Sequence, residues 1–193
     1  MNICVYAASS ARLAHDYYKA AEDLGRLMAE GGHTLIFGGG ADGLMGACAR
    51  GVQSAGGKMI GVAPRFFDEP GVLLKDGCEL VFTETVSERK MEMDRLADAF
   101  IALPGGIGTY EEFTETLTLK QLGQHREPMA MLSTMGYYEP FLALMQHTVD
   151  TGFMSKDVLS LFTLCQTPAE AMAHVTEPVP SVCPEPSIRG YNR

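Results

Sequence analysis

The chain has 193 residues, with 24 acidic against 15 basic residues and a formal net charge of −9. This length suits one compact domain with its own core. The acidic balance, without any stretch that concentrates Lys and Arg, argues against DNA and RNA as partners, because binding to a nucleic-acid backbone needs clustered cations.

Cysteine usage indicates reduced thiols. The five cysteines are widely spaced and form no CxxC pair, which argues against a disulfide framework and against a zinc site. No histidine stands at metal-ligand spacing from a Cys, Asp or Glu, and no segment has the pattern of an export signal or a membrane span. We therefore expect a cytoplasmic protein, and we assign it no membrane, no metal and no other cofactor.

Apolar runs of strand length alternate with helical patterns along the chain. Strands are predicted over 2–9, 33–40, 58–64, 78–84, 99–106, 128–133 and 162–166. Helices are predicted through 18–32, from about Gly43, from about Ser87, from Thr109, near 138–150 and 155–161, and from Pro168. This alternation predicts an α/β fold, a three-layer, Rossmann-like, doubly wound parallel sheet flanked by helices. Residues 1–176 are expected to form a single nucleotide-binding domain, and 177–193 a Pro-rich, extended C-terminal tail.

A first glycine-rich turn, "FGGGADGLMG", follows the second predicted strand. Gly38, Gly40 and Gly43 match the spacing GxGxxG, which in a dinucleotide fold brings a pyrophosphate close to a helix N-terminus. The match follows the second strand instead of the first, and an NAD-binding interpretation rests on it alone. A tight, closely packed strand-to-helix turn explains the glycines equally well.

The third predicted helix begins in "SERKMEMDRLADAF", with Ser87 as a plausible N-cap. Arg89 and Lys90 then fall in its first turn and on its inward side, where the helix dipole and burial both disfavour cations. An anionic ligand would explain this placement, and so would ion pairs with neighbouring carboxylates or side chains that reach the surface. For Asp94 we expect an ion pair with Lys90.

A second glycine-rich turn, "LPGGIGTYEEF", joins the strand 99–106 to the next helix. Gly105, Gly106 and Gly108 allow a concave nest of backbone N–H groups at the start of that helix, and Thr109 adds a hydroxyl. Such a nest is typical of phosphate binding. Two interpretations of Glu112 are open here, a capping box with Thr109 as the N-cap, or a functional carboxylate.

These turns together resemble the LOG family, the cytokinin riboside 5′-monophosphate phosphoribohydrolases, often labelled "lysine decarboxylase-like". The family's RK pair is present as Arg89 and Lys90, and its GG…GLMG element as Gly38-Gly39 and 43–46. Its first strand often ends in Gly-Ser-Ser, where this chain has Ala8-Ser9-Ser10. The resemblance covers about 2–176. The family pattern PGGxGTxxE is complete, as Pro104, Gly105, Gly106, Gly108, Thr109 and Glu112.

The resemblance implies hydrolysis of the N-glycosidic bond of a nucleoside 5′-monophosphate, either a cytokinin riboside monophosphate or AMP, to free base and ribose 5-phosphate. It implies Arg89 and Glu112 as catalytic residues and a homodimer. A carboxylate at this place suits a cationic, oxocarbenium-like transition state. The residues expected to bind the substrate lie at the end of the first strand and in the three turns: Ser9, Gly39, Gly40, Met45, Lys90, Gly105, Gly106, Ile107, Gly108 and Thr109.

Two competing functions remain to be weighed. A nucleotide or cofactor-carrier protein would use the same nests for binding and catalyse nothing. A pyridoxal-phosphate decarboxylase would need a Schiff-base lysine and a partner for the pyridine nitrogen. The sequence offers no such constellation, so the decarboxylase interpretation is rejected.

Overall fold

The computed structural model describes residues 1–177 and contains one seven-stranded sheet in the order β4-β3-β2-β1-β5-β6-β7. Every neighbouring pair of strands is parallel, which confirms the predicted parallel α/β sheet. Of the predicted tail, only Glu177 is among the described residues. The strands are β1 Asn2–Tyr6, β2 Thr34–Phe37, β3 Lys58–Pro64, β4 Glu79–Thr83, β5 Ala99–Ala102, β6 Met129–Leu132 and β7 Thr163–Cys165.

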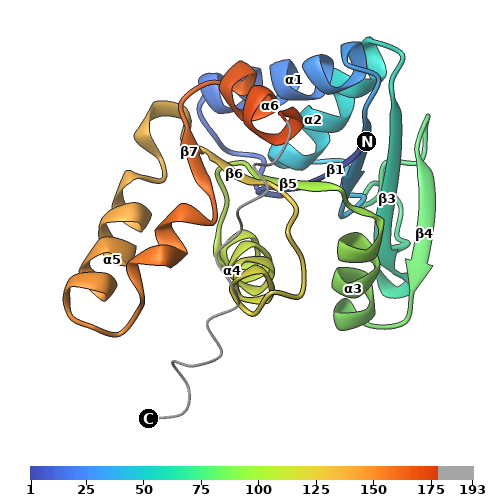
Figure 1. Ribbon diagram of the computed structural model, residues 1–193. Helices are drawn as coiled ribbons and strands as arrows, with labels where there is room; N and C mark the ends of the chain where they lie inside the picture. The colour runs from blue at the N-terminus through green and yellow to red at the C-terminus, as the bar shows by residue number, and fades with distance from the viewer. Residues whose placement is uncertain (178–193) are drawn as a thin grey trace.

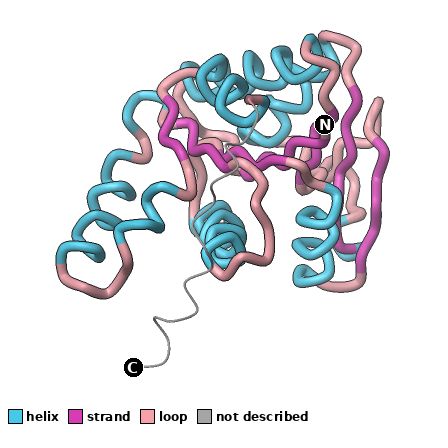
Figure 2. The backbone as a smooth tube through the Cα atoms, viewed as in Figure 1, coloured by secondary structure: helices cyan, strands magenta, loops and turns pink. Residues whose placement is uncertain are grey.

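Helices cover both faces of the sheet (Figure 1). On one face lie α1 His15–Glu30, α2 Gly43–Ser54 and α6 Pro168–Thr176; on the other lie α3 Val86–Leu96, α4 Ile107–Gln121 and α5 Glu139–Asp150. Figure 2 shows the strands as a single layer between these helices. None of the helices within residues 1–177 has the length and apolar character needed to cross a membrane.

The central strands bury side chains on both faces because helices lie above and below them. In β1, Ile3 and Val5 belong to the core with α1, α2 and α6, whereas Cys4 and Tyr6 belong to the core with α3, α4 and α5. This alternation follows from the two-residue period of a strand. The predicted near-continuous apolar strands are therefore the middle of a three-layer domain.

A topological switch point lies between β1 and β5. From β1 the chain builds the sheet outward through β2, β3 and β4, and it then returns to pair β5 with the other side of β1. The loops after β1 and β5 therefore diverge to opposite faces and leave a crevice between them. Ligands bind at such crevices in open α/β sheets.

Several predicted element boundaries are wrong by a few residues. The N-cap of helix α3 lies two residues before the predicted one, because the side chain of Thr85, not Ser87, caps the helix by accepting from the backbone N–H of Glu88 at 3.0 Å. Arg89 therefore lies at the end of the first turn and Lys90 beyond it, which weakens the argument from the helix dipole. The predicted helix 155–161 is a short 3-10 helix, Lys156–Ser160.

Candidate active site

A pocket of about 640 Å³ opens at the carboxyl ends of β1, β2 and β5. It collects most of the predicted site residues, and Gly39, Lys90, Gly105 and Ile107 lie outside its lining. The lining residues come from the turns after these strands, from α3 and α4, and from the segment between β3 and β4: Ala7, Ala8, Ser9, Ser10, Gly38, Gly40, Asp42, Met45, Phe67, Gly71, Val72, Leu73, Arg89, Gly106, Gly108, Thr109 and Glu112.

The guanidinium of Arg89 and the carboxylate of Glu112 meet in this pocket. Arg89 Nη2 lies 2.6 Å from Glu112 Oε1, and the two side chains are only 12% and 9% exposed. Burial raises the pKa of Glu112, and the neighbouring Arg89 charge offsets part of that rise. Arg89 Nε is buried without an acceptor among the described residues. Glu112 is thus a desolvated carboxylate whose ionised form is favoured mainly by Arg89 and to a smaller extent by Lys90.

The capping interpretation of Glu112 is wrong. Helix α4 begins at Ile107 with Gly106 at the N-cap and no capping side chain, so Thr109 lies inside the first turn and Glu112 almost two turns from the cap. Glycine is tolerated at an N-cap, because it easily adopts the non-helical backbone conformation that this position requires. Glu112 is therefore free of a capping role, and its carboxylate lines the pocket.

Lys90 has carboxylate partners of its own. Its ammonium bonds to Glu111, and it lies 2.6 Å from Glu115 Oε2, because α4 runs beside α3. The predicted ion pair with Asp94 is not among the described contacts; Asp94 accepts from the Tyr6 hydroxyl at 3.2 Å instead. Of the two cations that the sequence singled out, the structure brings only Arg89 into the pocket.

The start of α4 presents a row of backbone N–H groups. Within the described residues, no protein group accepts from the N–H groups of 105–109. A Cβ at Gly106 or Gly108 would meet nothing within 4 Å, so the pocket beside these glycines is open to a ligand. Ile107 is 82% exposed, so it contributes to the nest only through its backbone N–H. The geometry suits an anion at a helix N-terminus.

The turn before α2 has the opposite character. The N–H groups of Leu44 and Met45 both donate to the carbonyl of Ala8, at 2.9 and 3.2 Å. Gly43 has φ 62°, and a Cβ there would lie 2.4 Å from the same oxygen. The close-packing interpretation of the GxGxxG match is therefore confirmed, because protein acceptors occupy the donors that a pyrophosphate would need.

Two glycines of this turn shape the pocket through close contacts. A Cβ at Gly38 would lie 2.6 Å from Arg89 Nη2, so glycine is what lets the guanidinium pass. The N–H of Gly40 donates to the sulfur of Met45 at 3.3 Å, and both residues line the pocket with Ser9. Gly39 has φ 74° and serves the turn itself.

Sequence reasoning missed one wall of the pocket. The segment between β3 and β4 folds back over the turn after β2, where the Ala41 N–H donates to the Val72 carbonyl at 3.0 Å and the Leu74 N–H to the Gly39 carbonyl at 2.8 Å. It brings Phe67, Val72 and Leu73 to the pocket. The apolar residues of "FFDEPGVLL" in a loop between two strands were the available signal.

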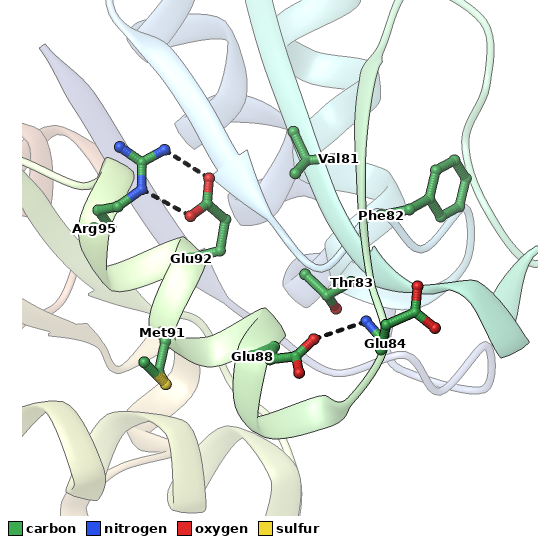
Figure 3. A pocket seen from close by; sticks show the side chains of 8 residues that line it. All are labelled: Val81, Phe82, Thr83, Glu84, Glu88, Met91, Glu92 and Arg95. Carbon is green, nitrogen blue, oxygen red and sulfur yellow. Dashed lines mark hydrogen bonds and ion pairs between the residues drawn. The ribbon is translucent and has the colours of Figure 1, made fainter.

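A second hollow, of about 560 Å³, lies between the edge strand β4 and α3 (Figure 3). Arg95 is the one cation among its lining residues, and its Nε and Nη2 each donate to a carboxylate oxygen of Glu92 at 2.7 Å. The Glu88 carboxylate accepts from the Glu84 N–H at 2.9 Å. With three glutamates and a neutralised arginine, this hollow does not suit an anionic ligand, so the pocket with Arg89 and Glu112 is the candidate active site.

Comparisons with known proteins show the family of the chain. A protein-family sequence model described as "Possible lysine decarboxylase" matches residues 45–175. A rice (Oryza sativa subsp. japonica) protein named cytokinin riboside 5′-monophosphate phosphoribohydrolase LOG is 39% identical over 178 residues, 92% of this chain and 74% of its own length. An Arabidopsis thaliana protein named cytokinin riboside 5′-monophosphate phosphoribohydrolase is 35% identical and covers 92% of this chain and 84% of its own.

Solved structures share the fold. The molybdenum cofactor carrier protein of Chlamydomonas reinhardtii superposes with a TM-score of 0.65 at 23% identity, covering 89% of this chain and 93% of the carrier. At that identity the likeness establishes the α/β architecture and leaves the chemistry of the pocket to its own residues.

Proposed function

The chain belongs to the LOG family of cytokinin riboside 5′-monophosphate phosphoribohydrolases, and we propose that it hydrolyses the N-glycosidic bond of a nucleoside 5′-monophosphate to free base and ribose 5-phosphate. The observation that carries the proposal is the buried Arg89–Glu112 pair, 2.6 Å apart, beside a helix N-terminus whose N–H groups have no protein acceptor within residues 1–177. The helix N-terminus suits the phosphate of the substrate, and the Arg89–Glu112 pair suits the reacting sugar.

The phosphate is assigned to the start of α4. Gly106, Gly108 and Thr109 line the pocket there, and the positive end of the helix dipole favours an anion. Binding of the phosphate fixes the ribose relative to α4, which also carries Glu112. The binding energy of a group that does not react is thus used to place the group that does.

Glu112 is assigned to the anomeric carbon. As the C1′–N bond breaks, positive charge develops on C1′ and the ring oxygen, and a carboxylate in a water-poor pocket stabilises that charge strongly. Water then adds through its oxygen to C1′, and its proton leaves with the base or through the carboxylate. Arg89 orients the Glu112 carboxylate and favours its ionised form, as the opposing effects on the Glu112 pKa indicate.

The base is assigned to the wall that the segment between β3 and β4 builds. Phe67, Val72 and Leu73 supply apolar surface there, and Met45 faces the same pocket. Such a wall accepts the plane of a purine and an apolar substituent on it. This is why we include cytokinin-type nucleotides beside AMP among the substrates.

A carrier function is less well supported. A protein that only binds a nucleotide gains nothing from a desolvated carboxylate of raised pKa, whereas such groups are typical of catalytic sites. A lysine decarboxylase activity has no support in the pocket, because none of its lining residues in the described chain is a lysine. Lys90, the nearest candidate by sequence, bonds to Glu111 and Glu115.

A homodimer in the cytoplasm is part of the proposal. Met91 on α3 and Ile107 on α4 are 71% and 82% exposed, and apolar side chains on helices beside a site are typical of subunit interfaces. The four described cysteines are free thiols, as a reducing compartment maintains them. Light scattering of the purified protein tests the dimer.

Incubation of the purified protein with AMP and with isopentenyladenosine monophosphate tests the proposed reaction. Chromatography should detect free adenine or isopentenyladenine together with an equal amount of ribose 5-phosphate. Binding of both nucleotides without release of either base would instead support a carrier.

A further inference from the structure

Three consecutive carbonyl groups of the turn after β5 are each held by a different donor. The Tyr138 hydroxyl donates to the Leu103 carbonyl at 2.6 Å, the Ala8 N–H to the Pro104 carbonyl at 3.2 Å, and the Tyr137 hydroxyl to the Gly105 carbonyl at 2.7 Å. Two of the donors are neighbouring tyrosines that follow β6, far along the chain. None of the three is part of a regular helix or strand ladder.

Holding these carbonyls fixes where the N–H groups of the turn point. In a planar trans peptide, the C=O of one residue and the N–H of the next point in opposite directions. The bond to the Pro104 carbonyl therefore aims the Gly105 N–H, and the bond from Tyr137 to the Gly105 carbonyl aims the Gly106 N–H. Gly106 is the N-cap of α4 and lines the pocket.

An unusual turn delivers the two tyrosines. Met135 has φ 56°, which a side-chain-bearing residue rarely adopts, and Gly136 follows with φ 73°. The Ser133 hydroxyl accepts from the Tyr138 N–H at 2.9 Å and closes the turn. Backbone strain of this kind persists where the surroundings enforce it and concentrates near functional sites. Here it places two phenols against one loop.

The hydrogen-bond direction is fixed by elimination. A carbonyl oxygen can only accept a hydrogen bond, so the Tyr137 hydroxyl uses its one proton to donate to the Gly105 carbonyl. Tyr110, whose hydroxyl lies 3.2 Å from that of Tyr137, must then be the donor to Tyr137. Burial, together with the Tyr110 hydroxyl, raises the pKa of Tyr137 to about 12, so the phenol keeps its proton and remains a donor at neutral pH.

We propose that Tyr137 is a positioning residue for the phosphate of the substrate, which acts by aiming the Gly106 N–H into the pocket through its bond to the Gly105 carbonyl. Tyr138 supports the same loop two peptides earlier, through its bond to the Leu103 carbonyl. The inference rests on the proposed function, because it takes the anion at the start of α4 to be the substrate's 5′-phosphate. It adds a residue outside the pocket lining that affects phosphate affinity.

Calorimetry on Tyr137→Phe tests the proposal without turnover, with inorganic phosphate and ribose 5-phosphate as probes. The Phe ring keeps the contacts with Tyr17 and Tyr138, whose centroids lie 5.9 and 5.1 Å away, so the fold should persist. We expect both phosphate ligands to bind about tenfold more weakly, as for one lost hydrogen bond. Adenosine, which has no phosphate, should bind as to wild type. In steady-state assays KM for AMP should rise while kcat changes little.

Tyr17→Phe is the matched control, because Tyr17 packs edge-on against Tyr137 and donates to none of the three carbonyls. It should bind phosphate as wild type does. Tyr138→Phe removes the bond to the Leu103 carbonyl, and because Pro104 has no N–H to aim, it should weaken phosphate binding less than Tyr137→Phe does. Equal phosphate affinity in wild type and Tyr137→Phe, or an equal loss for adenosine, would overturn the role of Tyr137. Phosphate binding without base release would overturn the proposed function and leave this inference standing; no phosphate binding by wild type would overturn both.

Discussion

Arg89 Nη2 and Glu112 Oε1 lie 2.6 Å apart although 23 residues separate them in the chain. The helix after β4 supplies one and the helix after β5 supplies the other, and the two helices run side by side under the sheet. Arg89 offsets part of the effect of burial on Glu112, which favours the ionised form of a buried carboxylate. This relationship has consequences for pH dependence and for stability.

Replacing Arg89 with Gln should move the acid limb of the pH–rate profile to higher pH. Burial raises the pKa of Glu112 and Arg89 lowers it, so loss of the cation raises that pKa further. Because the reaction uses the ionised carboxylate, activity falls as pH falls through this pKa. The profile of kcat/KM for Arg89→Gln measures the shift, and Arg89→Lys, which keeps the charge, should leave the limb near wild type. If the acid limb of Arg89→Gln lies at the same pH as in wild type, Arg89 does not lower the pKa of Glu112.

Glu112→Gln should be at least as stable as wild type near neutral pH. A raised pKa means that the folded state binds the proton of Glu112 more tightly than the unfolded chain does. The free energy of unfolding of the wild type therefore falls as pH rises from the ordinary glutamate range through the raised pKa. Gln does not titrate, so urea denaturation across this range should show the variant gaining on wild type as pH rises. A constant difference would contradict the assignment.

Alanine substitutions at Gly105 and Gly108, in the turn between β5 and α4, should have different effects on stability. At Gly108 a Cβ meets open pocket space, and alanine favours the helix by about 0.5–1 kcal/mol, so Gly108→Ala should raise KM for AMP without lowering Tm. At Gly105 a Cβ would lie 2.1 Å from Thr109 Oγ1, so Gly105→Ala should raise KM and also destabilise the protein by about 1–3 kcal/mol. Unchanged KM in Gly108→Ala would place the phosphate elsewhere.

Tyr6 connects the two helices that carry the catalytic pair. Its buried hydroxyl lies 2.9 Å from Thr116 Oγ1 on α4 and 3.2 Å from Asp94 Oδ1 on α3. Tyr6→Phe leaves these partly buried groups without that partner and should lower the free energy of unfolding by about 1–3 kcal/mol. Urea denaturation measures the loss. Tyr18→Phe on α1 is the control and should change stability by less than about 0.5 kcal/mol; equal losses would show that the connection contributes nothing specific.

The layer order of the fold was predictable because each strand and helix has its own local signal, and a parallel sheet is what alternating signals produce. The turns at 38–46 and 103–109 were predictable for the same reason. Helix starts were less so, because Thr85 and Ser87 are both good N-caps and only the surrounding structure selects Thr85.

Contacts across elements were beyond the sequence. Lys90 has Glu111 and Glu115 as partners because of the register between α3 and α4, which no local pattern encodes. The same holds for Tyr137, which reaches Gly105 from a turn after a different strand. The wall formed by Phe67 and Val72 depends on a loop that folds back, and loops carry little periodic signal.

Glu112 is the carboxylate that we propose acts on the ribose, and base release by Glu112→Gln is the most direct test of that role. The measurement pairs chromatographic assay of free base from AMP and isopentenyladenosine monophosphate with calorimetric binding of both nucleotides. We expect kcat to fall by about 10²-fold or more, with nucleotide affinity close to wild type. Turnover at the wild-type rate in a variant that binds normally would contradict the mechanism.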